Sequence, residues 1–239
     1  MEHGSDPQGL TPGPTADLMA STTKVKICGL RTEAALEAAL AGGADFVGLV
    51  FFPPSPRNLA PEAARGLAAR ARGRAGIVAL MVDPDDALIA AVAAAVDPDM
   101  LQLHGEESPE RVAEVRQRWG KPVMKAIKVE TAADAAAALR YRNSADLILF
   151  DARAPHESTR PGGNGAPFDW RALAAVKDQL PYMLSGGLTP DNVADAIRIT
   201  GAAMVDVSSG VEARPGEKDP ELIRRFLRAA KAAKQGAQT

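Results

Sequence analysis

The segment KVKICGLRTEAALEAALAGGADFVGLVF, residues 24–51, holds the pattern that decides the fold. Its two ends, 24–30 and 45–51, are short runs rich in valine, isoleucine and other apolar residues, which predicts two β-strands. Between them, alanine and leucine recur at helical spacing up to Gly42, a residue type that favours the end of a helix. A strand, a helix and a second strand in so short a span predict two parallel strands joined by a crossover helix.

The same unit repeats along the rest of the chain. Six further strand-like runs are GIVALMV (76–82), MLQLHG (100–105), PVMKAIKV (122–129), ADLILFDA (145–152), YMLSGGL (182–188) and MVDVSSG (204–210). Helical segments rich in alanine separate the runs, and a last one, DPELIRRFLRAAKAAK, follows the eighth run. Eight such units predict a protein of the α/β class with a single (β/α)8 barrel, the TIM-barrel architecture. An open doubly wound sheet is the alternative, but no G-x-G-x-x-G opens the first helix.

The helical segments carry boundary signals of their own. In Ser108-Pro109 and Thr189-Pro190 a capping residue precedes a proline that suits the first helical position, so we expect a helix to begin at each. We also expect a helix over FDWRALAAVKDQ, residues 168–179.

The overall composition bounds the partners and the compartment. The 239 residues carry a formal net charge of −2 at pH 7, which gives no general attraction for nucleic acid or an anionic membrane surface. No stretch approaches the roughly 18 apolar residues that span a bilayer. Because Cys28 is the one cysteine in the sequence, an intramolecular disulfide is excluded. We therefore expect a cytoplasmic protein without nucleic-acid or membrane partners. Residues 1–22, rich in Gly, Pro, Ser and Thr, are interpreted as a flexible extension before the barrel domain, residues 23–239.

Alternation within the strands predicts which side chains enter the barrel. In the first strand Val25 and Ile27 are expected to face the surrounding helices, so that Lys26 and Cys28 face inward. The same reasoning for the fourth, sixth and eighth strands adds Gln102, His104, Asp151, Asp206 and Ser208 to the inward set. Polar groups at the ends of barrel strands meet at the C-terminal mouth, where enzymes of this fold bind their substrates.

Two glycine-containing turns at this mouth predict a phosphate site. Successive backbone N–H groups and a helix start attract phosphate, and the loops after strands 7 and 8 form the usual phosphate site of such barrels. The residues in these two turns are Gly186, Gly187, Ser208, Ser209 and Gly210. Each turn taken alone is equally consistent with a tight structural turn.

Cys28 and Asp151 are the candidates for proton transfer. A cysteine thiolate acts as a base when neighbouring charge lowers its pKa, and Lys26 or the helix after Arg31 is placed to supply that charge. Asp151 ends an apolar run and precedes a long loop rich in glycine and proline, residues 153–167, which we expect to act as a lid. A carboxyl under a lid is suited to general acid catalysis. Alternatively, Cys28 is a small core residue and Asp151 a solvated loop residue.

Other residues at the mouth are candidates for substrate binding. Arg57, in a loop stiffened by prolines, presents a planar fork that suits a carboxylate, although a lone arginine is more often a solvated one. His104 and Asp206 are further binding candidates, although for His104 and Gln102 we favour a structural or orienting role. Three histidines and no Cys/His cluster make a metal site improbable.

Six segments in order resemble the phosphoribosylanthranilate isomerase family. They are KICGL (26–30), DFVGLVFFPPSPRNL (45–59), LQLHGEE (101–107), LFDA with GGNGAPFDW (149–170), LSGGLTPDNV (184–193) and VDVSSGVE with PGEKD (205–219). Together the resemblance covers residues 24 to about 234. Residue 152 is an alanine where this family is expected to carry a small hydroxyl residue.

The resemblance implies an Amadori rearrangement in tryptophan biosynthesis, without a cofactor or a metal. It implies that N-(5-phosphoribosyl)anthranilate becomes 1-(2-carboxyphenylamino)-1-deoxyribulose 5-phosphate. By motif match Cys28 would be the general base and Asp151 the general acid, while Arg57 would bind the anthranilate carboxylate. The expected partner is a phosphorylated small molecule, and the expected assembly is a monomer or a homodimer.

Two other functions fit parts of the pattern. A sugar-phosphate isomerase of the histidine pathway resembles this chain in fold, but such enzymes look as though they use two aspartates, and Cys28 on the first strand argues against that. A non-catalytic phosphate-binding barrel would keep the glycine turns but would have no need for both Cys28 and Asp151.

Overall fold

The computed structural model describes residues 22–152 and 168–233. The predicted lid, residues 153–167, lies outside the described residues, as does all of the predicted extension except Thr22.

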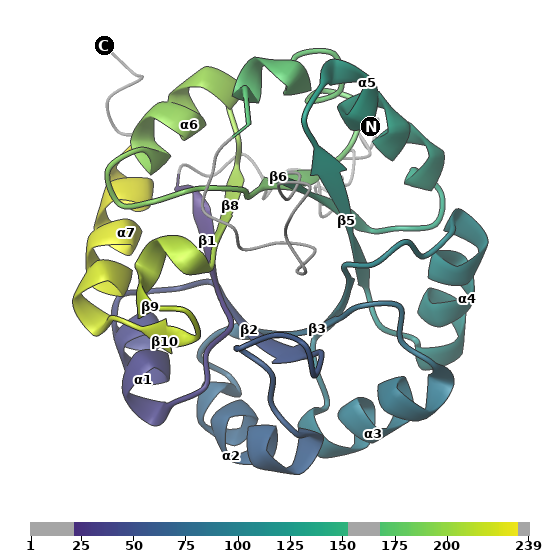
Figure 1. Ribbon diagram of the computed structural model, residues 1–239, viewed down its shortest axis with the longest axis vertical. Helices are drawn as coiled ribbons and strands as arrows, with labels where there is room; N and C mark the ends of the chain where they lie inside the picture. The colour runs from purple at the N-terminus through teal and green to yellow at the C-terminus, as the bar shows by residue number, and fades with distance from the viewer. Residues whose placement is uncertain (1–21, 153–167, 234–239) are drawn as a thin grey trace, which may run out of the picture.

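Eight parallel strands close into one barrel, as predicted, with the helices in a ring around them (Figure 1). The strands are β1 (Lys24–Cys28), β2 (Phe46–Phe51), β3 (Gly76–Met81), β4 (Met100–Leu103), β5 (Val123–Val129), β6 (Leu147–Ala152), β7 (Tyr182–Leu184) and β8 (Met204–Val207). Each strand pairs with its neighbours in sequence, and β1 pairs with β8 to complete the circle.

The helices cover the outside of the barrel with their apolar faces. They are α1 (Glu33–Ala41), α2 (Pro61–Ala71), α3 (Asp86–Val96), α4 (Pro109–Trp119), α5 (Ala132–Ala136), α6 (Val193–Thr200) and α7 (Pro220–Ala232). Short 3-10 helices are η2 (Ala137–Tyr141), η3 (Trp170–Leu173) and η4 (Ser209–Val211). The predicted start at Ser108-Pro109 is confirmed, because the Ser108 side chain caps α4 by accepting a hydrogen bond from the Arg111 amide.

The predicted helix start at Thr189-Pro190 is wrong. Helix α6 begins only at Val193, after the N-cap residue Asn192. The Asn192 side chain accepts a hydrogen bond from the Thr189 amide and donates one to the Gly187 carbonyl. It thereby holds residues 189–192 in a turn that braces the loop after β7.

The predicted α-helix over residues 168–179 is also wrong. Only the 3-10 helix η3 and a series of turns occur there, with bonds such as Ala174 N to Arg171 O that span three residues. The Gln179 side chain donates to the Ala175 carbonyl and so takes part of its hydrogen-bonding capacity from the backbone.

An ion pair lies inside the barrel at the seam where β1 meets β8. Lys26 and Asp206 are register partners across this seam, and Lys26 Nζ lies 2.9 Å from Asp206 Oδ1. The lysine side chain is 0% exposed and the aspartate 5%. A Cβ at Gly48 on the neighbouring strand would lie 2.9 Å from Cys28 Sγ and 3.2 Å from Lys26 Cε, so the glycine leaves the space that both side chains fill. Below this level an apolar cluster of Met124, Ala126, Leu147, Leu149 and Met183 fills the barrel.

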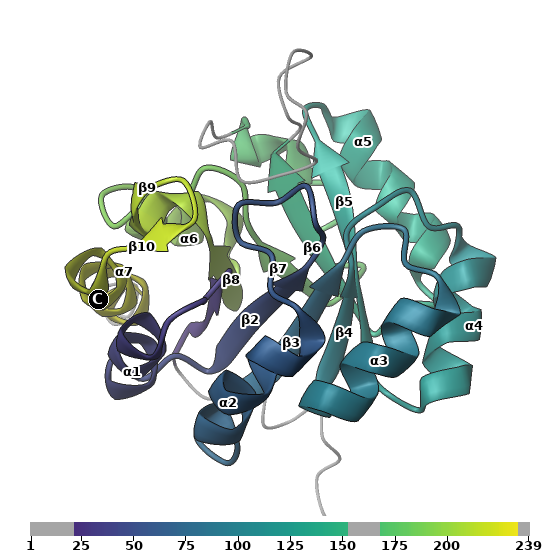
Figure 2. The same cartoon turned by 60° about the horizontal axis from the view of Figure 1, so that its bottom comes forward.

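A small antiparallel hairpin follows the eighth strand and was not predicted. Strands β9 (Glu212–Arg214) and β10 (Glu217–Lys218) form a two-stranded sheet of their own. Figure 2 shows it beside the C-terminal end of β8, above α7. Gly216 in its turn has φ 82°, and a Cβ there would lie 2.5 Å from the Pro56 carbonyl oxygen. The hairpin therefore packs directly on the loop after β2.

Removal of one partner of the seam ion pair is expected to destabilise the barrel strongly. Lys26→Met leaves the Asp206 carboxylate buried without its cation, and such a loss costs about 3–5 kcal/mol. The double variant Lys26→Met/Asp206→Leu removes both charges and is expected to recover most of that free energy of unfolding in urea titrations. Arg74→Met is the control, because its partner Glu37 and Arg74 itself are 43% and 47% exposed, and an exposed pair contributes about 0–1 kcal/mol. Equal losses in Lys26→Met and Arg74→Met would contradict a structural role for the seam pair.

Candidate active site

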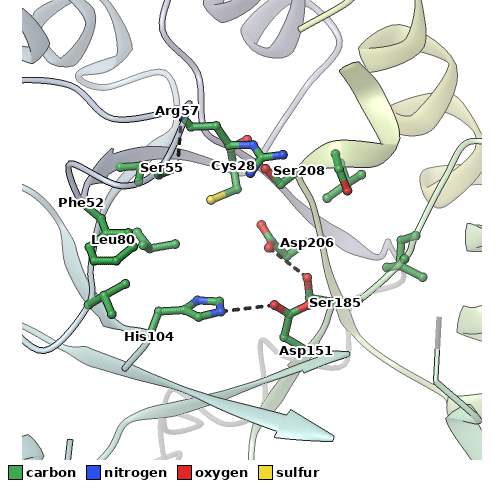
Figure 3. Close-up of a pocket in the computed structure, with 17 residues that line it drawn as sticks. Cys28, Phe52, Ser55, Arg57, Leu80, His104, Asp151, Ser185, Asp206 and Ser208 are labelled. Carbon is green, nitrogen blue, oxygen red and sulfur yellow. Dashed lines mark hydrogen bonds and ion pairs between the residues drawn. The ribbon is translucent and has the colours of Figure 1, made fainter. Parts of the chain in front are cut away.

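A pocket opens at the C-terminal mouth of the barrel, between the ends of the strands (Figure 3). Nine of the ten predicted site residues line this pocket, and Gly210 does not. The nine are Cys28, Arg57, His104, Asp151, Gly186, Gly187, Asp206, Ser208 and Ser209. They come from the ends of strands and from loops that are far apart in the sequence. The alternation of side chains along the strands brings Cys28, His104, Asp151, Asp206 and Ser208 together as predicted, and the loops add the others.

Cys28 lies in the pocket wall against apolar side chains. It clusters with Val50 and Leu80, and Phe52 and Val82 pack against the same group. Its side chain is free of any disulfide and almost fully buried. The structure therefore places a thiol beside an apolar surface of the pocket.

Burial raises the pKa of the Cys28 thiol above its ordinary value. The ammonium groups of Lys26 and Lys218 oppose this by favouring the thiolate, whereas the Asp206 carboxylate adds to the rise. The predicted effect of Lys26 is therefore present in direction, but desolvation of the thiolate is larger. Lys26 itself has a raised pKa, because Asp206 and Cys28 together outweigh the burial that would lower it.

Asp151 is held by two hydrogen bonds at the opposite side of the pocket. His104 Nε2 lies 3.2 Å from Asp151 Oδ2, and the Ala152 amide donates to Asp151 Oδ1 over 3.0 Å. The Gln102 amide nitrogen lies 3.0 Å from His104 Nδ1. Because an amide NH2 only donates, Nδ1 accepts, and a neutral His104 then carries its proton on Nε2 and donates to Asp151. Gln102 and His104 thus orient Asp151, while His104 also lines the pocket.

Arg57 is buried at the rim and is paired with a carboxylate. Its Nε and Nη2 atoms donate to the two carboxylate oxygens of Glu212 over 2.7 and 2.8 Å. Lys218 Nζ donates to Glu212 Oε1 over 2.7 Å and to the Ser208 carbonyl over 2.9 Å. Burial lowers the pKa of Lys218 to about 8 although Glu212 acts to raise it. Burial would raise the pKa of Glu212, but Arg57 and Lys218 together hold it below its ordinary value.

The two glycine turns lie against their neighbours as well as against the pocket. Gly186 and Gly187 have φ of 85° and 68°. A Cβ at Gly186 would lie 2.3 Å from the Ala152 nitrogen, and one at Gly210 would lie 1.9 Å from the Leu188 carbonyl oxygen. Gly210 therefore contacts the turn after β7 and does not line the pocket itself. Both turns keep their shape only with glycine at these positions.

Three contributors to this site carried no role in the sequence prediction. Glu212 and Lys218 belong to the quoted VE and EKD segments, but charges on both sides of Lys218 are typical of an exposed loop. Ser185 is buried and donates to Asp206 Oδ2 over 3.2 Å. Its signal was available, because Ser185 precedes Gly186 directly after β7 and stands two residues after the inward-facing Met183.

Among the described residues, 22–152 and 168–233, no group of three or more His, Cys, Asp or Glu side chains is arranged to hold a metal ion. None of their helices is long and apolar enough to span a membrane.

Fold and pocket together define a class of protein. It is a (β/α)8-barrel enzyme with a thiol and a carboxyl at its catalytic mouth and with the glycine turns that bind phosphate in this fold.

The amino-acid sequence matches one family of such barrel enzymes. The family model described as N-(5'phosphoribosyl)anthranilate (PRA) isomerase matches residues 25–229. A protein of Rhodopseudomonas palustris (strain BisA53) named N-(5'-phosphoribosyl)anthranilate isomerase is 61% identical over 208 residues, which are 87% of this chain and 95% of the relative. The chain therefore belongs to the phosphoribosylanthranilate isomerase family.

Solved structures agree with this assignment. One is a phosphoribosyl anthranilate isomerase in complex with reduced 1-(o-carboxyphenylamino)-1-deoxyribulose 5-phosphate, at 36% identity and a TM-score of 0.77 over 88% of this chain and 99% of that chain. Another holds monomers generated from the dimeric isomerase of Thermotoga maritima, with 36% identity, a TM-score of 0.77 and the same coverage of 88% and 99%.

The raised pKa of Cys28 is expected to appear in its alkylation by iodoacetamide. Because the thiolate is the reactive form, the rate should rise with pH and reach its midpoint above the ordinary thiol value of 9.0. Mass spectrometry assigns the product without ambiguity, since the chain has one cysteine. The urea-unfolded protein is the control, because its cysteine has no burial to raise the pKa. A midpoint in the folded protein at or below that of the unfolded protein would show that the nearby ammonium groups outweigh burial.

Proposed function

We propose that the chain converts N-(5-phosphoribosyl)anthranilate to 1-(2-carboxyphenylamino)-1-deoxyribulose 5-phosphate, an intramolecular aldose–ketose isomerisation of tryptophan biosynthesis. One observation carries the proposal: the Cys28 thiol and the Asp151 carboxyl face one pocket from different strands, and two glycine-containing turns line the same pocket. Membership of the isomerase family supports the same reaction. The direct test is to incubate the purified protein with phosphoribosylanthranilate and follow the loss of the fluorescence of this substrate.

Asp151 is proposed as the general acid for ring opening. Its proton passes to the ribose ring oxygen, the bond between that oxygen and C1′ breaks, and a Schiff base forms between C1′ and the anthranilate nitrogen. The carboxylate that remains is stabilised where it stands, because His104 and the Ala152 amide both donate to it.

Cys28 is proposed as the general base for the next step. The Schiff base acidifies the C2′ proton, the thiolate removes it, and the C–H electrons form the enolamine, which then tautomerises to the ketose. The ammonium groups of Lys26 and Lys218 favour the thiolate, and the positive charge of a protonated Schiff base adds to their effect. The substrate thereby helps to offset the burial that raises the pKa of the free enzyme's thiol.

The two ends of the substrate have separate binding groups in this proposal. Arg57 takes the anthranilate carboxylate, with Phe52 and Leu80 as an apolar wall for the aromatic ring. The phosphate is bound by the turns that contain Gly186, Gly187, Ser208 and Ser209, which Gly210 supports through its contact with Leu188. Asp206, paired with Lys26, lies between the two ends, near Cys28.

The assembly and the location belong to the same proposal. The expected partner is the phosphorylated small molecule, with no cofactor, no metal and no nucleic acid, in a monomer or a homodimer. The relative from Thermotoga maritima is described as dimeric. A biosynthetic role on a soluble intermediate fits a cytoplasmic location, which cell fractionation tests.

Cys28→Ala and Asp151→Ala are each expected to nearly abolish kcat in a folded protein. Each variant removes a proton-transfer group, and such a group contributes about 10²–10⁴-fold. Phosphate binding should persist, because it rests on the turns after β7 and β8. Ser144→Ala is a matched control, since Ser144 is small, polar and buried but does not line the pocket. Near-normal turnover by folded Cys28→Ala would make Cys28 a core residue and would refute its role as the base.

Arg57→Ala is expected to weaken substrate binding more than it slows the chemistry. A hydrogen bond to a charged group contributes about 1.5–3 kcal/mol, so KM should rise by about ten-fold or more while kcat changes less. Arg214→Ala is the control, because Arg214 lies in the nearby hairpin with its side chain 76% exposed. An unchanged KM in Arg57→Ala would place the carboxylate site elsewhere.

A further inference from the structure

Glu212 holds the Arg57 fork in a fixed orientation. Its carboxylate meets Arg57 edge to edge, with Nε on Oε1 and Nη2 on Oε2 at 2.7 and 2.8 Å. The Arg57 and Glu212 side chains are only 7% and 4% exposed. A bidentate pair of this kind fixes the plane of the guanidinium as well as its position. No hydrogen bond from Nη1 to any residue in the described ranges, 22–152 and 168–233, accompanies this pair, so the edge that carries Nη1 is open to another partner.

Glu212 is fixed in its turn by the hairpin that carries it. Lys218 Nζ donates to Glu212 Oε1 over 2.7 Å, and the Gly216 amide donates to Glu212 Oε2 over 3.2 Å. Gly216 itself lies against the carbonyl of Pro56, the residue before Arg57. The hairpin therefore contacts the loop after β2 at two neighbouring points: Glu212 bonds to Arg57, and Gly216 packs on Pro56.

The charges of this cluster do not cancel. Arg57 and Lys218 contribute two positive charges and Glu212 one negative charge, all of them nearly buried. A buried excess of positive charge is costly unless an anion completes it. The cluster lies at the rim of the pocket, because Arg57 lines it and Lys218 contacts Ser208, another lining residue. An anion that balances this charge has access from the pocket side.

We propose that Glu212 is a positioning residue for carboxylate recognition: it orients Arg57 so that the Nη1 edge meets the anthranilate carboxylate of the substrate. This inference rests on the proposed function, because that function supplies the carboxylate. Glu212 does not touch the substrate in this proposal and acts only through Arg57.

Two effects of Glu212→Gln have opposite signs, and this makes the proposal testable. The variant removes a negative charge, so simple electrostatics would strengthen anion binding. It also replaces one acceptor oxygen by an amide group that cannot accept from Arg57, so the fork loses its bidentate partner. If orientation dominates, as we propose, anthranilate binding weakens by about ten-fold, which corresponds to roughly 1.4 kcal/mol.

The experiment compares Glu212→Gln, Arg57→Ala and the double variant with the unaltered full-length chain. Binding of anthranilate, followed by its own fluorescence, gives a dissociation constant that needs no turnover, and steady-state kinetics give KM and kcat. We expect weaker anthranilate binding and a raised KM in Glu212→Gln, with kcat within about three-fold of normal. In the Arg57→Ala background Glu212→Gln should have no further effect on binding. Glu217→Gln is the matched control, since Glu217 lies in the same hairpin and is 56% exposed.

Three results would overturn the proposal. They are unchanged or tighter anthranilate binding by Glu212→Gln, additive losses in the double variant, and an equal loss in Glu217→Gln. Thermal melting of each variant separates a loss of folding from a loss of binding. Should Glu212→Gln fail to fold, Glu212→Asp keeps the charge but shortens the reach to Arg57, and undiminished binding by it would count against the proposal. Failure of the proposed function is distinct, because the unaltered chain would then bind anthranilate without turning over phosphoribosylanthranilate.

Discussion

The ion pair between Lys26 and Asp206 is the interaction on which the site depends. It joins the first strand of the barrel to the last, across 180 residues of sequence, in the strand pair that closes the sheet. Because side chains alternate, a Lys26 that faces inward requires Cys28, two residues later, to face inward one level higher. The register that pairs Lys26 with Asp206 therefore also brings the end of β1 level with Ser208, whose hydroxyl donates to the Cys28 carbonyl.

Buried charge also holds two pairs of loops at the mouth of the barrel. Lys125 on β5 lies 2.8 Å from Glu107 and donates to the Gly105 carbonyl, and Glu107 accepts from the Asp83 amide. The loops after β3 and β4 are thus tied to one buried lysine, in the way that Glu212 ties the loop after β2 to the hairpin after β8. The helices that surround the barrel (Figure 1), in contrast, are held on the strands by apolar packing. Apolar contact suffices for the scaffold, whereas the mouth needs polar groups that stay in fixed directions.

The sequence was sufficient for the barrel because its evidence was local and repeated. Each strand showed either a run of apolar residues or a period of two, and each helix a separate periodicity, so that an error in one unit did not alter the whole. Residues 168–179 show the limit of this reasoning, because helical spacing in the sequence does not reveal that the backbone forms a 3-10 helix and turns there. The start of α6 was also predicted wrongly, because the Asn192 side chain bonds to Thr189 and Gly187 in the preceding turn, and this contact is not visible in the sequence.

The site residues likewise fall into those that the sequence predicted and those that it did not. Strand alternation placed Cys28, His104, Asp151 and Asp206 in one pocket, because an inward position near a strand end is a geometric consequence of the fold. Nothing local marks Glu212 as the partner of Arg57, 155 residues away, or Lys218 as a buried residue. Their contacts follow from a two-stranded hairpin of three and two residues, which is too short to leave a pattern.

The burial of Cys28 also bears on how the protein meets oxidants. Peroxides attack thiolates far faster than thiols, and oxidation beyond the sulfenic acid is irreversible for most cysteines. A thiol whose pKa is raised by an apolar wall is mostly protonated in the resting protein and so presents little of the vulnerable form. With no second cysteine in the chain to form a rescuing disulfide, protection has to come from the environment of the sulfur itself. The desolvation that disfavours the thiolate in the resting protein is therefore expected also to slow the oxidation of the sulfur by peroxides.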